Sequence, residues 1–338
     1  MTTFHAPDVA APTPLGPTFR HARGADDVDA LLAVQVGRAE RDQVDPLSSG
    51  ESIPTRERLA IVLAEAEAAG QLDRYLIVEL NRAVIGYGRV SDWKEDDGMH
   101  VWLHRGWVLP AWRGCGVGTA LLRRLEGRIR ELAVADGGER WEYAANASST
   151  EPDATALLLD NGYRPGYTVL EMGLDWDAFP RPADGPALPA GFVTRPVRPE
   201  DAPAVSRSID EAYLYEYADG RYQTRMNVDA FAEELLGSRY DLSLLQVAWA
   251  GDEVAGQVIP LIERGRAEIY EVSVRPAYRR RGLARALLSR ALLDLEARGV
   301  GVVRLGTVAE FPTRAVELYQ SLGFRILKEF PRYRKSQT

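Results

Sequence analysis

One segment occurs twice in this chain, as Pro110-Ala-Trp-Arg-Gly-Cys-Gly-Val-Gly-Thr-Ala-Leu-Leu122 and as Pro276-Ala-Tyr-Arg-Arg-Arg-Gly-Leu-Ala-Arg-Ala-Leu-Leu288. The two copies are identical at seven of thirteen positions. A second match follows each copy, formed by Ala154, Leu157 and Gly162-Tyr163 in the first half and by Ala315, Leu318 and Gly323-Phe324 in the second. Because both matches recur in the same order, the sequence predicts two copies of one domain in tandem.

The length of 338 residues agrees with two domains of ordinary size. Regular patterning stops in a proline-rich stretch around Asp184, where missing backbone donors favour extended structure. We therefore expect a mobile tail over 1–17, an N-terminal domain over 18–176, a linker over 177–191 and a C-terminal domain over 192–338.

Composition narrows the class of protein. The net charge of −8 argues against broad nucleic-acid binding, which needs a surface excess of lysine and arginine. No apolar run is long enough to span a membrane, and Met1 to Pro17 lacks the pattern of a secretory signal. The single cysteine, Cys115, allows no internal disulfide and no zinc ribbon. These features predict a cytoplasmic globular protein without a metal site.

The hydrophobic pattern of the second repeat predicts an α+β fold. Leu283, Leu287, Ala291 and Leu295 recur at fourfold spacing, which indicates an amphipathic helix over 282–298. Further helices are expected over 200–215, 228–236 and 313–322, and strands over 192–197, 244–250, 253–262, 267–274, 302–307 and 324–330. The first repeat follows the same order through 74–80, 83–90, 101–108, a helix over 116–133, and 139–145. Each domain is thus predicted to hold a mixed central sheet of about six strands with flanking helices.

A loop with the same spacing precedes the long helix of each repeat. Its positions are Val108, Arg113, Gly116 and Gly118 in the first repeat, and Val274, Arg279, Gly282 and Ala284 in the second. A strand that enters a helix through such a loop points backbone N–H groups and the positive end of the helix dipole at one spot, which suits a pyrophosphate. The alternative interpretation is a solvated loop with a glycine needed for helix packing. A dinucleotide fingerprint fits poorly, because its third glycine would fall at Thr119.

Both repeats resemble the GNAT (Gcn5-related N-acetyltransferase) superfamily. The resemblance is carried by the R-x-x-G-x-G/A loop and by the pattern A-x-x-L-Y-x-x-x-G-F over 315–324. It covers the core of both repeats and implies GNAT-like domains with a splay between the fourth and fifth strands, where acetyl-CoA lies. The cofactor-binding residues that it implies are Val272, Val274, Arg279, Arg280, Arg281, Gly282, Leu283, Ala284 and Arg285 in the second repeat, and Val108, Arg113, Gly114, Cys115, Gly116, Val117, Gly118 and Thr119 in the first.

Acetyl transfer to an amine needs a group that accepts the amine proton and one that protonates the leaving thiolate. The resemblance places Tyr319 at the acid position and Glu268, six residues before the valine, at a base position. Strand alternation puts Glu268 and Tyr270 on one face and Glu271 on the other, unless a bulge shifts the register. Glu271 is the second candidate base. A packed tyrosine and a solvated glutamate are the structural alternatives.

The first repeat departs from the family pattern. Leu158 stands where the second repeat has Tyr319, and leucine cannot donate a proton. His104 lies four residues before Val108, where some family members place a catalytic histidine. His100 and His104 would be about 13 Å apart along a strand, so they do not form a zinc-binding pair.

The leading hypothesis is an N-acetyltransferase that moves an acetyl group from acetyl-CoA to a primary amine by direct attack, with the C-terminal domain as catalyst. The acceptor is expected to be a small-molecule amine, received by the acidic and aromatic segment 210–222 through ion pairs and cation–π contacts. Two alternatives remain open: catalysis by the N-terminal domain through His104, and an acyl-CoA-binding sensor or scaffold without turnover. Neither nucleic acid nor a membrane is expected as a partner, and the sequence does not determine the oligomeric state.

Overall fold

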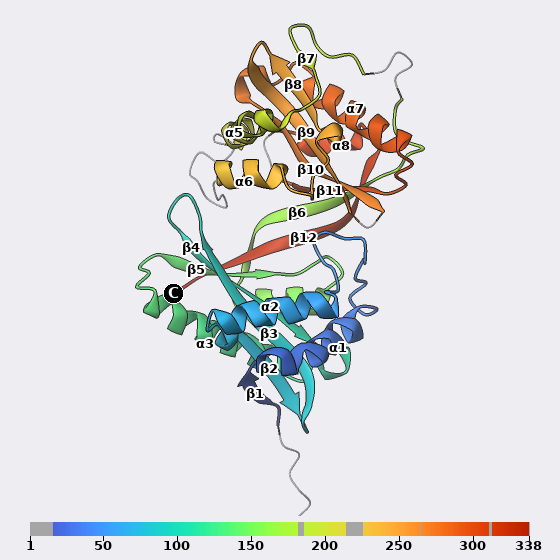
Figure 1. The fold of residues 1–338 in the computed structure, drawn as a ribbon. Coiled ribbons are helices and arrows are strands. Elements are labelled where there is room, and N and C mark those ends of the chain that lie inside the picture. The colour runs from blue at the N-terminus through green and yellow to red at the C-terminus, as the bar shows by residue number, and fades with distance from the viewer. Residues whose placement is uncertain (1–15, 182–185, 214–225, 264, 311–312, 338) are drawn as a thin grey trace, which may run out of the picture. The chain divides into compact units, whose positions relative to one another are not determined.

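The computed structural model describes residues 16–181, 186–213, 226–263, 265–310 and 313–337, drawn in Figure 1. The chain divides into two compact units, which we describe separately. The first unit consists of the described parts of Met1–Gln43, Ile53–Ser91 and His104–Asp136, and the second of those of Val44–Ser52, Asp92–Leu103 and Gly137–Thr338. The predicted tail lies almost wholly outside the described residues.

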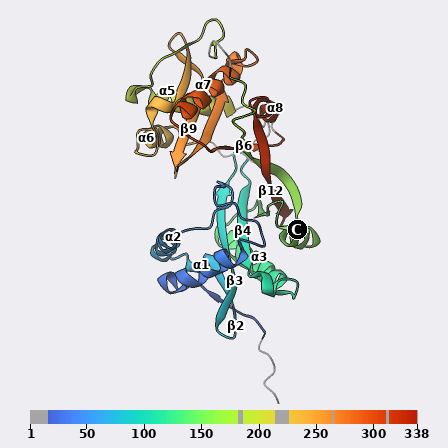
Figure 2. The ribbon, with the colours of Figure 1, turned by 90° about the vertical axis from the view of Figure 1, so that its right-hand side faces the viewer.

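The first unit is a sheet with helices on both faces. Its strands follow the order β1 (Thr18–His21), β2 (Tyr75–Leu80), β3 (Ala83–Lys94) and β4 (His100–Val108), of which the end of β3 from Asp92 and the start of β4 up to Leu103 belong to the second unit. The helices α1 (Val28–Arg38) and α2 (Arg56–Ala68) cover one face, and α3 (Val117–Ala135) covers the other (Figures 1 and 2). A glycine permits the close approach of α3, because a Cβ atom on Gly88 would lie 2.6 Å from Leu125 Cδ1.

The second unit contains a larger mixed sheet in the order β5-β12-β6-β11-β10-β9-β8-β7. The strands are β5 (Trp141–Asn146), β6 (Arg164–Leu174), β7 (Val193–Thr194), β8 (Gln246–Ala250), β9 (Glu253–Glu263), β10 (Arg266–Val274), β11 (Val303–Val308) and β12 (Phe324–Ser336). The helices are α4 (Pro152–Asp160), α5 (Ala202–Tyr213), α6 (Val228–Leu235), α7 (Leu283–Ala297) and α8 (Ala315–Gln320). Short 3-10 helices occur in both units. They are η1 (Gly24–Asp27), η2 (Leu72–Arg74) and η3 (Pro110–Trp112) in the first unit, and η4 (Pro199–Asp201), η5 (Leu242–Leu244) and η6 (Pro276–Tyr278) in the second. These elements confirm the predicted α+β class with tandem halves.

Side-chain alternation along the strands of the second unit separates two cores. Ala248 and Ala267 pack with α7 on one face, whereas Val247, Trp249 and Leu261 pack with α5 and α6 on the other. The amphipathic helix expected over 282–298 is α7, and its apolar stripe is buried as the fourfold spacing predicts. The sheet is therefore covered on both faces, and the ends of its strands remain for a ligand site.

The last strands of the two sequence repeats are interleaved in this unit. Strand β6 ends the first repeat and pairs with β11 and β12 of the second. Strand β12 ends the second repeat and pairs with β5 of the first. The compact units therefore cut across the repeats, while the domain limits expected from the sequence stay a prediction.

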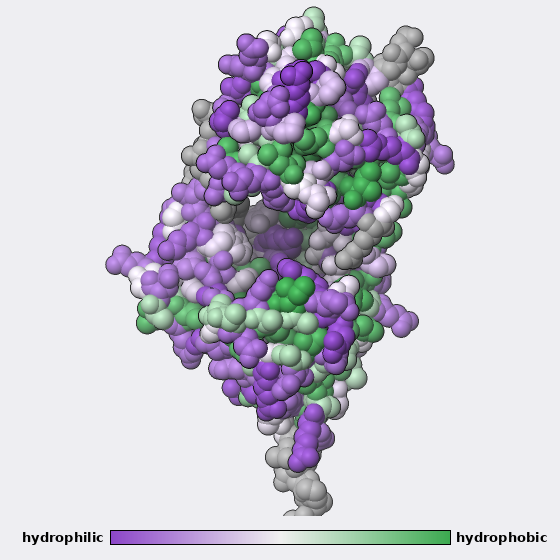
Figure 3. Space-filling view, in the orientation of Figure 1, coloured by the Kyte–Doolittle hydropathy of each residue, from purple (hydrophilic) through white to green (hydrophobic). Residues whose placement is uncertain are grey.

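The surface is mostly polar on the face shown in Figure 3, where small apolar groups lie between hydrophilic side chains. Within the described residues, we find no helix that combines the length and the apolar character needed to cross a membrane.

Candidate active site

Strands β10 and β11 separate part-way along their length. They pair in parallel from Ala267 opposite Val303 to Ile269 opposite Leu305, after which β10 runs on to Val274 and β11 to Val308. Beyond this point β11 still pairs with β6, and β10 still pairs with β9. A cavity of about 690 Å³ opens between the separated ends. This arrangement confirms the splay that the resemblance implied.

Backbone donors of β10 face this gap. The N–H of Arg275 donates to the carbonyl of Ala255 on the β9 side, at 3.0 Å. Because peptide directions alternate along an antiparallel ladder, the N–H groups of Val272 and Val274 point the other way, into the gap. Both valines line the cavity.

The loop after β10 aims further donors at the same cavity. Arg280 and Gly282 adopt left-handed backbone conformations, with φ of 62° and 83°, and turn the chain into α7. The N–H of Ala286 is bonded to the Gly282 carbonyl, so the amides of residues 283–285 precede the first intrahelical bond. Gly282 is the N-cap of α7 and makes no side-chain hydrogen bond to these donors, and N–H groups at such a helix start can bind an anion.

The first repeat builds the same loop in the first unit. Gly114 and Gly116 have φ of 73° and 89°, and the Ala120 N–H bonds the Gly116 carbonyl at 3.0 Å. Cys115 is exposed and donates its thiol proton to the Trp112 carbonyl. Val117, Gly118 and Thr119 form the first turn of α3. The identical spacing of the two repeats thus corresponds to the same backbone conformation.

The first arginine of each loop holds the loop to its strand. Arg279 Nε donates to the Val274 carbonyl at 2.9 Å, and its Nη2 donates to the Ala212 carbonyl at the end of α5 at 2.6 Å. In the first repeat, Arg113 Nε donates to the Val108 carbonyl at the same distance of 2.9 Å. These contacts give both arginines a structural role beside the cofactor role that the resemblance implied.

Arg113 is also part of a buried ion-pair cluster that the sequence did not reveal. It contacts both carboxylate oxygens of Asp42, at 2.5 and 2.9 Å, and Arg38 contacts the same carboxylate at 3.2 Å. Burial opposes ionisation of Asp42, but the hydrogen bonds and charge of the two arginines outweigh it and lower its pKa. A single aspartate outside any motif carries no sequence signal for such a contact.

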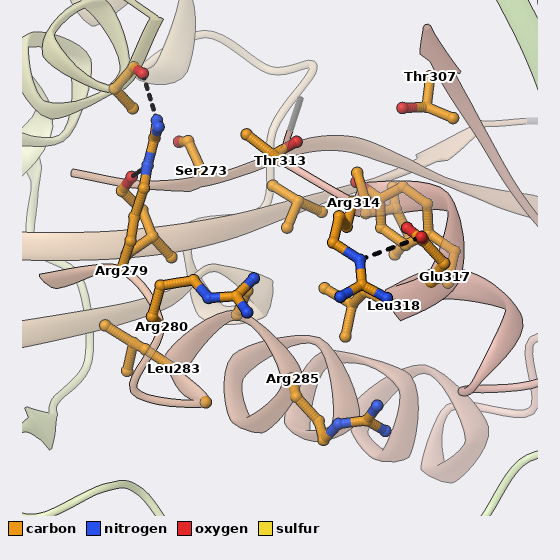
Figure 4. Close-up of a pocket in the computed structure, with 18 of the residues that line it drawn as sticks. Ser273, Arg279, Arg280, Leu283, Arg285, Thr307, Thr313, Arg314, Glu317 and Leu318 are labelled. Atoms are coloured by element: carbon orange, nitrogen blue, oxygen red, sulfur yellow. Dashed lines mark hydrogen bonds and ion pairs between the residues drawn. The ribbon is translucent and has the colours of Figure 1, made fainter. Parts of the chain in front are cut away.

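Three other arginines surround the cavity of the second unit, as Figure 4 shows. Arg280 and Arg285 come from the loop and α7, and Arg314, which the sequence analysis missed, comes from the residue before α8. Arg314 has a left-handed φ of 59° and is bonded to Glu317 at 3.1 Å. Arg281 instead donates to the Ala190 carbonyl and lies over the Phe192 ring, outside the cavity lining.

Tyr319 lines the same cavity from α8. Its side chain is 6% exposed and its ring packs edge-on against Phe324, with centroids 6.1 Å apart. Leu283 and Ala284 also line this cavity. The structure therefore brings the predicted acid together with the loop and with the free backbone of β10.

A bulge in β10 changes where the candidate bases point. The register shifts between Ile269 and Glu271, so Tyr270 is the extra residue. Val272 packs with the α7 core, whereas Glu271 accepts a hydrogen bond from Tyr213 of α5 at 3.0 Å. Glu271 thus shares the α5 face with Glu268, and the bulge overrides simple alternation. Glu268 itself lies outside the cavity lining, two positions before Tyr270, which lines it.

Glu268 is partly buried in a charged environment. Its side chain is 22% exposed, and Arg266 lies 3.7 Å away. Burial raises the pKa of Glu268, while the charge of Arg266 and the polar Ser49 side chain act in the opposite direction. A raised pKa suits a carboxylate that must accept a proton near neutral pH.

The candidate residues of the first repeat are divided between the units. His104 is buried on β4 in the first unit, and Leu158 is buried on α4 in the second. His100 contacts Asp92 at 2.8 Å and stacks on Trp102. In the acceptor segment 210–222, residues 214–222 lie outside the described residues.

A glycine and a polar chain behind β10 escaped the sequence analysis. Gly256 pairs with Val274, and a Cβ atom there would lie 2.8 Å from the Ser273 carbonyl oxygen. A chain of buried hydrogen bonds runs from α5 to the cavity wall. The Ser208 hydroxyl donates to Gln257 Oε1, and Gln257 Nε2 donates to the Ser273 hydroxyl oxygen. A glycine inside an expected strand was the available signal for close backbone approach.

The comparisons with known proteins agree with this geometry. Residues 42–163 and 204–324 each match the family model described as "Acetyltransferase (GNAT) family". A mycothiol acetyltransferase of Kineococcus radiotolerans is 29% identical over 323 residues, covering 93% of this chain and 95% of that protein. A mycothiol acetyltransferase of Nocardia farcinica is 28% identical, covering 85% and 89%.

Solved structures share the fold across nearly the whole chain. A GCN5-related N-acetyltransferase from Sphaerobacter thermophilus has a TM-score of 0.72 at 24% identity, covering 95% of each chain. A tandem GNAT protein from the clavulanic acid biosynthesis pathway has a TM-score of 0.63 at 17% identity, covering 95% of this chain and 98% of that one. At these identities the likeness supports the fold.

Proposed function

Because this chain belongs to the acetyltransferase (GNAT) family and is an N-acetyltransferase, we propose that its C-terminal repeat transfers the acetyl group of acetyl-CoA to a primary amine. One observation favours the C-terminal repeat as the catalytic one. In the second unit, the free edge of β10, the loop before α7 and Tyr319 all line one cavity.

The residues that line the cavity fit acetyl-CoA, which is the acyl donor. The loop amides of residues 283–285, with Arg280 and Arg285 beside them, would hold the pyrophosphate, because orphan N–H groups at a helix start bind anions. The N–H groups of Val272 and Val274 would hydrogen-bond the pantetheine arm and the thioester carbonyl. Acetyl-CoA supplies the activated acyl group when it is bound.

Two side chains of the protein then transfer protons: one accepts the proton of the amine, and the other protonates the leaving thiolate. Glu268 accepts the proton that the amine loses, because its partly buried carboxylate shares the α5 face of β10 with residues of the cavity wall. Tyr319, which lines the cavity, donates a proton to the departing thiolate. The amine attacks the thioester directly, so no acyl-enzyme bond forms.

We propose a small-molecule amine as acceptor. The amine that becomes mycothiol on acetylation is the first candidate, because relatives named mycothiol acetyltransferase align over most of this chain. Glu271, next to Tyr270 of the cavity lining, would receive a cationic amine through the charge of its carboxylate.

The test is CoA release measured against a panel of amines. Tyr319→Phe should lower kcat about 10²- to 10⁴-fold, the usual contribution of a positioned acid, and should leave acetyl-CoA binding intact. Tyr75→Phe, in the first unit, is the matched control and should keep full activity. A normal rate for Tyr319→Phe would remove it from the mechanism.

Two further outcomes decide between the alternatives. Tight acetyl-CoA binding by calorimetry without transfer to any amine would favour a sensor. Loss of activity in His104→Ala together with full activity in Tyr319→Phe would move catalysis to the first repeat.

A further inference from the structure

A serine of β10 lies in the wall of the cavity on the side of α5. Val272 and Val274 pack with the α7 core, so side-chain alternation places Ser273 on the opposite face of the strand. Ser273 lines the cavity (Figure 4), together with Ala212 and Tyr213 from the end of α5. The proposed mechanism uses the backbone of this part of β10 and assigns no role to the serine side chain.

The Ser273 hydroxyl is held from behind by buried polar side chains. Gln257 of β9 pairs with Ser273 across the two strands, and its Nε2 donates to the Ser273 hydroxyl oxygen. Gln257 is itself held, because its Oε1 accepts the hydroxyl of Ser208 on α5 at 2.6 Å. All three side chains belong to residues that are at most 5% exposed. Among the described residues, Gln257 is the hydrogen-bond partner of the Ser273 hydroxyl, which leaves the hydroxyl proton for a ligand in the cavity.

The first unit has a tryptophan at the equivalent position. Trp107 and Ser273 each come one residue before the end of their strand, β4 or β10. The glycines behind them agree with this equivalence. A Cβ atom on Gly86 would lie 2.7 Å from the Trp107 carbonyl oxygen, and a Cβ atom on Gly256 would lie 2.8 Å from the Ser273 carbonyl oxygen. The two repeats therefore place a tryptophan and a serine on the same backbone.

Trp107 fills the face of the strand that the smaller serine leaves open. It packs against the core of α1 and α2, its ring lies 4.8 Å from that of Tyr87, and Arg38 of α1 lies over it at 5.9 Å. Tyr87 takes the place of Gln257, and its hydroxyl accepts a hydrogen bond from Gln35 of α1 at 2.5 Å. Aromatic rings thus occupy this face in the first unit, whereas small polar groups occupy it in the second.

The α5 face of β10 is the side that suits a polar acceptor. In the proposed complex the acyl carrier lies along the backbone edge of β10, and its pyrophosphate lies at the start of α7. The α7 face is filled by apolar side chains of the core. The α5 face carries Ser273 and Glu271, and Glu271 accepts a hydrogen bond from Tyr213 at 3.0 Å. An amine with a polar body therefore finds matching groups on the α5 face.

We propose that Ser273 is a specificity-determining residue that contacts the acceptor. Its small side chain leaves the α5 face of the cavity open, and its hydroxyl donates to an oxygen atom of the acceptor. This inference rests on the proposed function, acetyl transfer in the C-terminal repeat, and adds that the acceptor carries a hydroxyl or carbonyl oxygen close to its amine. In the N-terminal repeat, Trp107 closes the equivalent face to such an acceptor.

The experiment compares ethanolamine with propylamine as acceptors for the full-length protein, because the two amines differ only by a hydroxyl in place of a methyl group. A site that hydrogen-bonds a substrate hydroxyl discriminates against the analogue that lacks it. Wild-type kcat/KM should favour ethanolamine. Ser273→Ala should lower kcat/KM for ethanolamine by about 2- to 13-fold, the contribution of one hydrogen bond, without a change for propylamine. Ser289→Ala, at a serine of α7 that is also 5% exposed but lies outside this cavity lining, is the control and should match the wild type.

A second variant tests the open space. Ser273→Trp introduces the residue of the first repeat, and we expect it to lose acetyl transfer to both amines while its Kd for acetyl-CoA, measured by calorimetry, stays at the wild-type value. A wild-type rate of transfer in Ser273→Trp overturns the inference. Where Ser273→Trp fails to bind acetyl-CoA, the comparison of the two amines in Ser273→Ala decides.

A chemical label tests the same contact without enzyme activity. In a protein whose single cysteine, Cys115, is replaced by serine, Ser273→Cys should react with 2-aminoethyl methanethiosulfonate, a small cationic amine that modifies thiols. Ser206→Cys, at a fully buried serine of α5, is the control and should stay unmodified. Mass spectrometry of the intact protein detects the added group.

The outcomes separate this inference from the proposed function. An equal loss for both amines in Ser273→Ala, or no loss for either, overturns the inference, while the acetyl transfer itself still supports the proposed function. A protein that acetylates no amine of the wider panel refutes the proposed function. Where neither ethanolamine nor propylamine is acetylated, labelling decides: a modified Ser273→Cys supports the inference, and an unreactive one overturns it.

Discussion

Arg280 combines a strained backbone with a proposed ligand contact, and replacing it with glycine separates the two. Its φ of 62° matches the 73° of Gly114, the equivalent residue of the first repeat. A non-glycine residue in this conformation costs roughly 1–2 kcal/mol. Glycine relieves that strain but adds about 0.4–1 kcal/mol of unfolded-chain entropy. Arg280→Gly should therefore leave the free energy of unfolding unchanged or raise it by up to about 1.5 kcal/mol.

Affinity for acetyl-CoA should change in the opposite direction. A hydrogen bond to a charged group contributes about 1.5–3 kcal/mol, which corresponds to roughly 10- to 100-fold in Kd. Because Arg280 is exposed, we expect the lower end, about a tenfold weaker Kd, and a smaller loss at high salt.

The assays are calorimetric titration with acetyl-CoA and urea unfolding of the same preparations. Arg280→Lys, which keeps the charge and the strain, should stay close to the wild type in both. Unchanged affinity in Arg280→Gly would refute the cation's role at the pyrophosphate. A clear loss of stability would refute the reasoning from backbone strain.

Two further predictions follow from the buried contacts and the interleaved strands. Asp42→Asn should lower the free energy of unfolding by about 3–5 kcal/mol at pH 7, because it removes the carboxylate that pairs with Arg38 and Arg113. The folded state lowers the pKa of Asp42, so the stabilisation by this carboxylate is present above the ordinary carboxyl range and is lost as pH falls through the folded pKa. Urea unfolding at several pH values should therefore show a smaller difference between Asp42→Asn and the wild type in acid. Residues 1–176 and 192–338 expressed separately should show no cooperative unfolding by circular dichroism, because β12 of one fragment lies between β5 and β6 of the other, whereas co-expression should restore it. A deficit independent of pH, or two stably folded fragments, would contradict these expectations.

The local parts of the site could be predicted from the sequence. The loops around Gly116 and Gly282 have the expected helix starts and matching left-handed conformations, because spacing and glycine content act over a few residues. The apolar stripe from Leu283 to Leu295 is buried for the same reason. The position of Tyr319 on the wall of the cavity also agrees with the motif that surrounds it.

Other parts of the site depend on contacts between distant residues. The bulge at Tyr270 turns Glu271 to the α5 face, and only pairing with β9 reveals it. Arg279 follows the family pattern in sequence, but its bonds to strand and helix carbonyls require the folded loop. Asp42 has no motif, because a buried ion pair is defined by the partners that surround it.

By itself, the sequence determined that two copies of an α+β domain follow one another, each with a glycine-containing loop before its long helix, since periodicity and turn chemistry are properties of neighbouring residues. Only the tertiary structure decided that β6 and β12 are interleaved and that residues 44–52 join the second unit. The physical reason is that strand register and buried ion pairs are set by whichever surfaces satisfy each other in three dimensions, over sequence separations that no local pattern records.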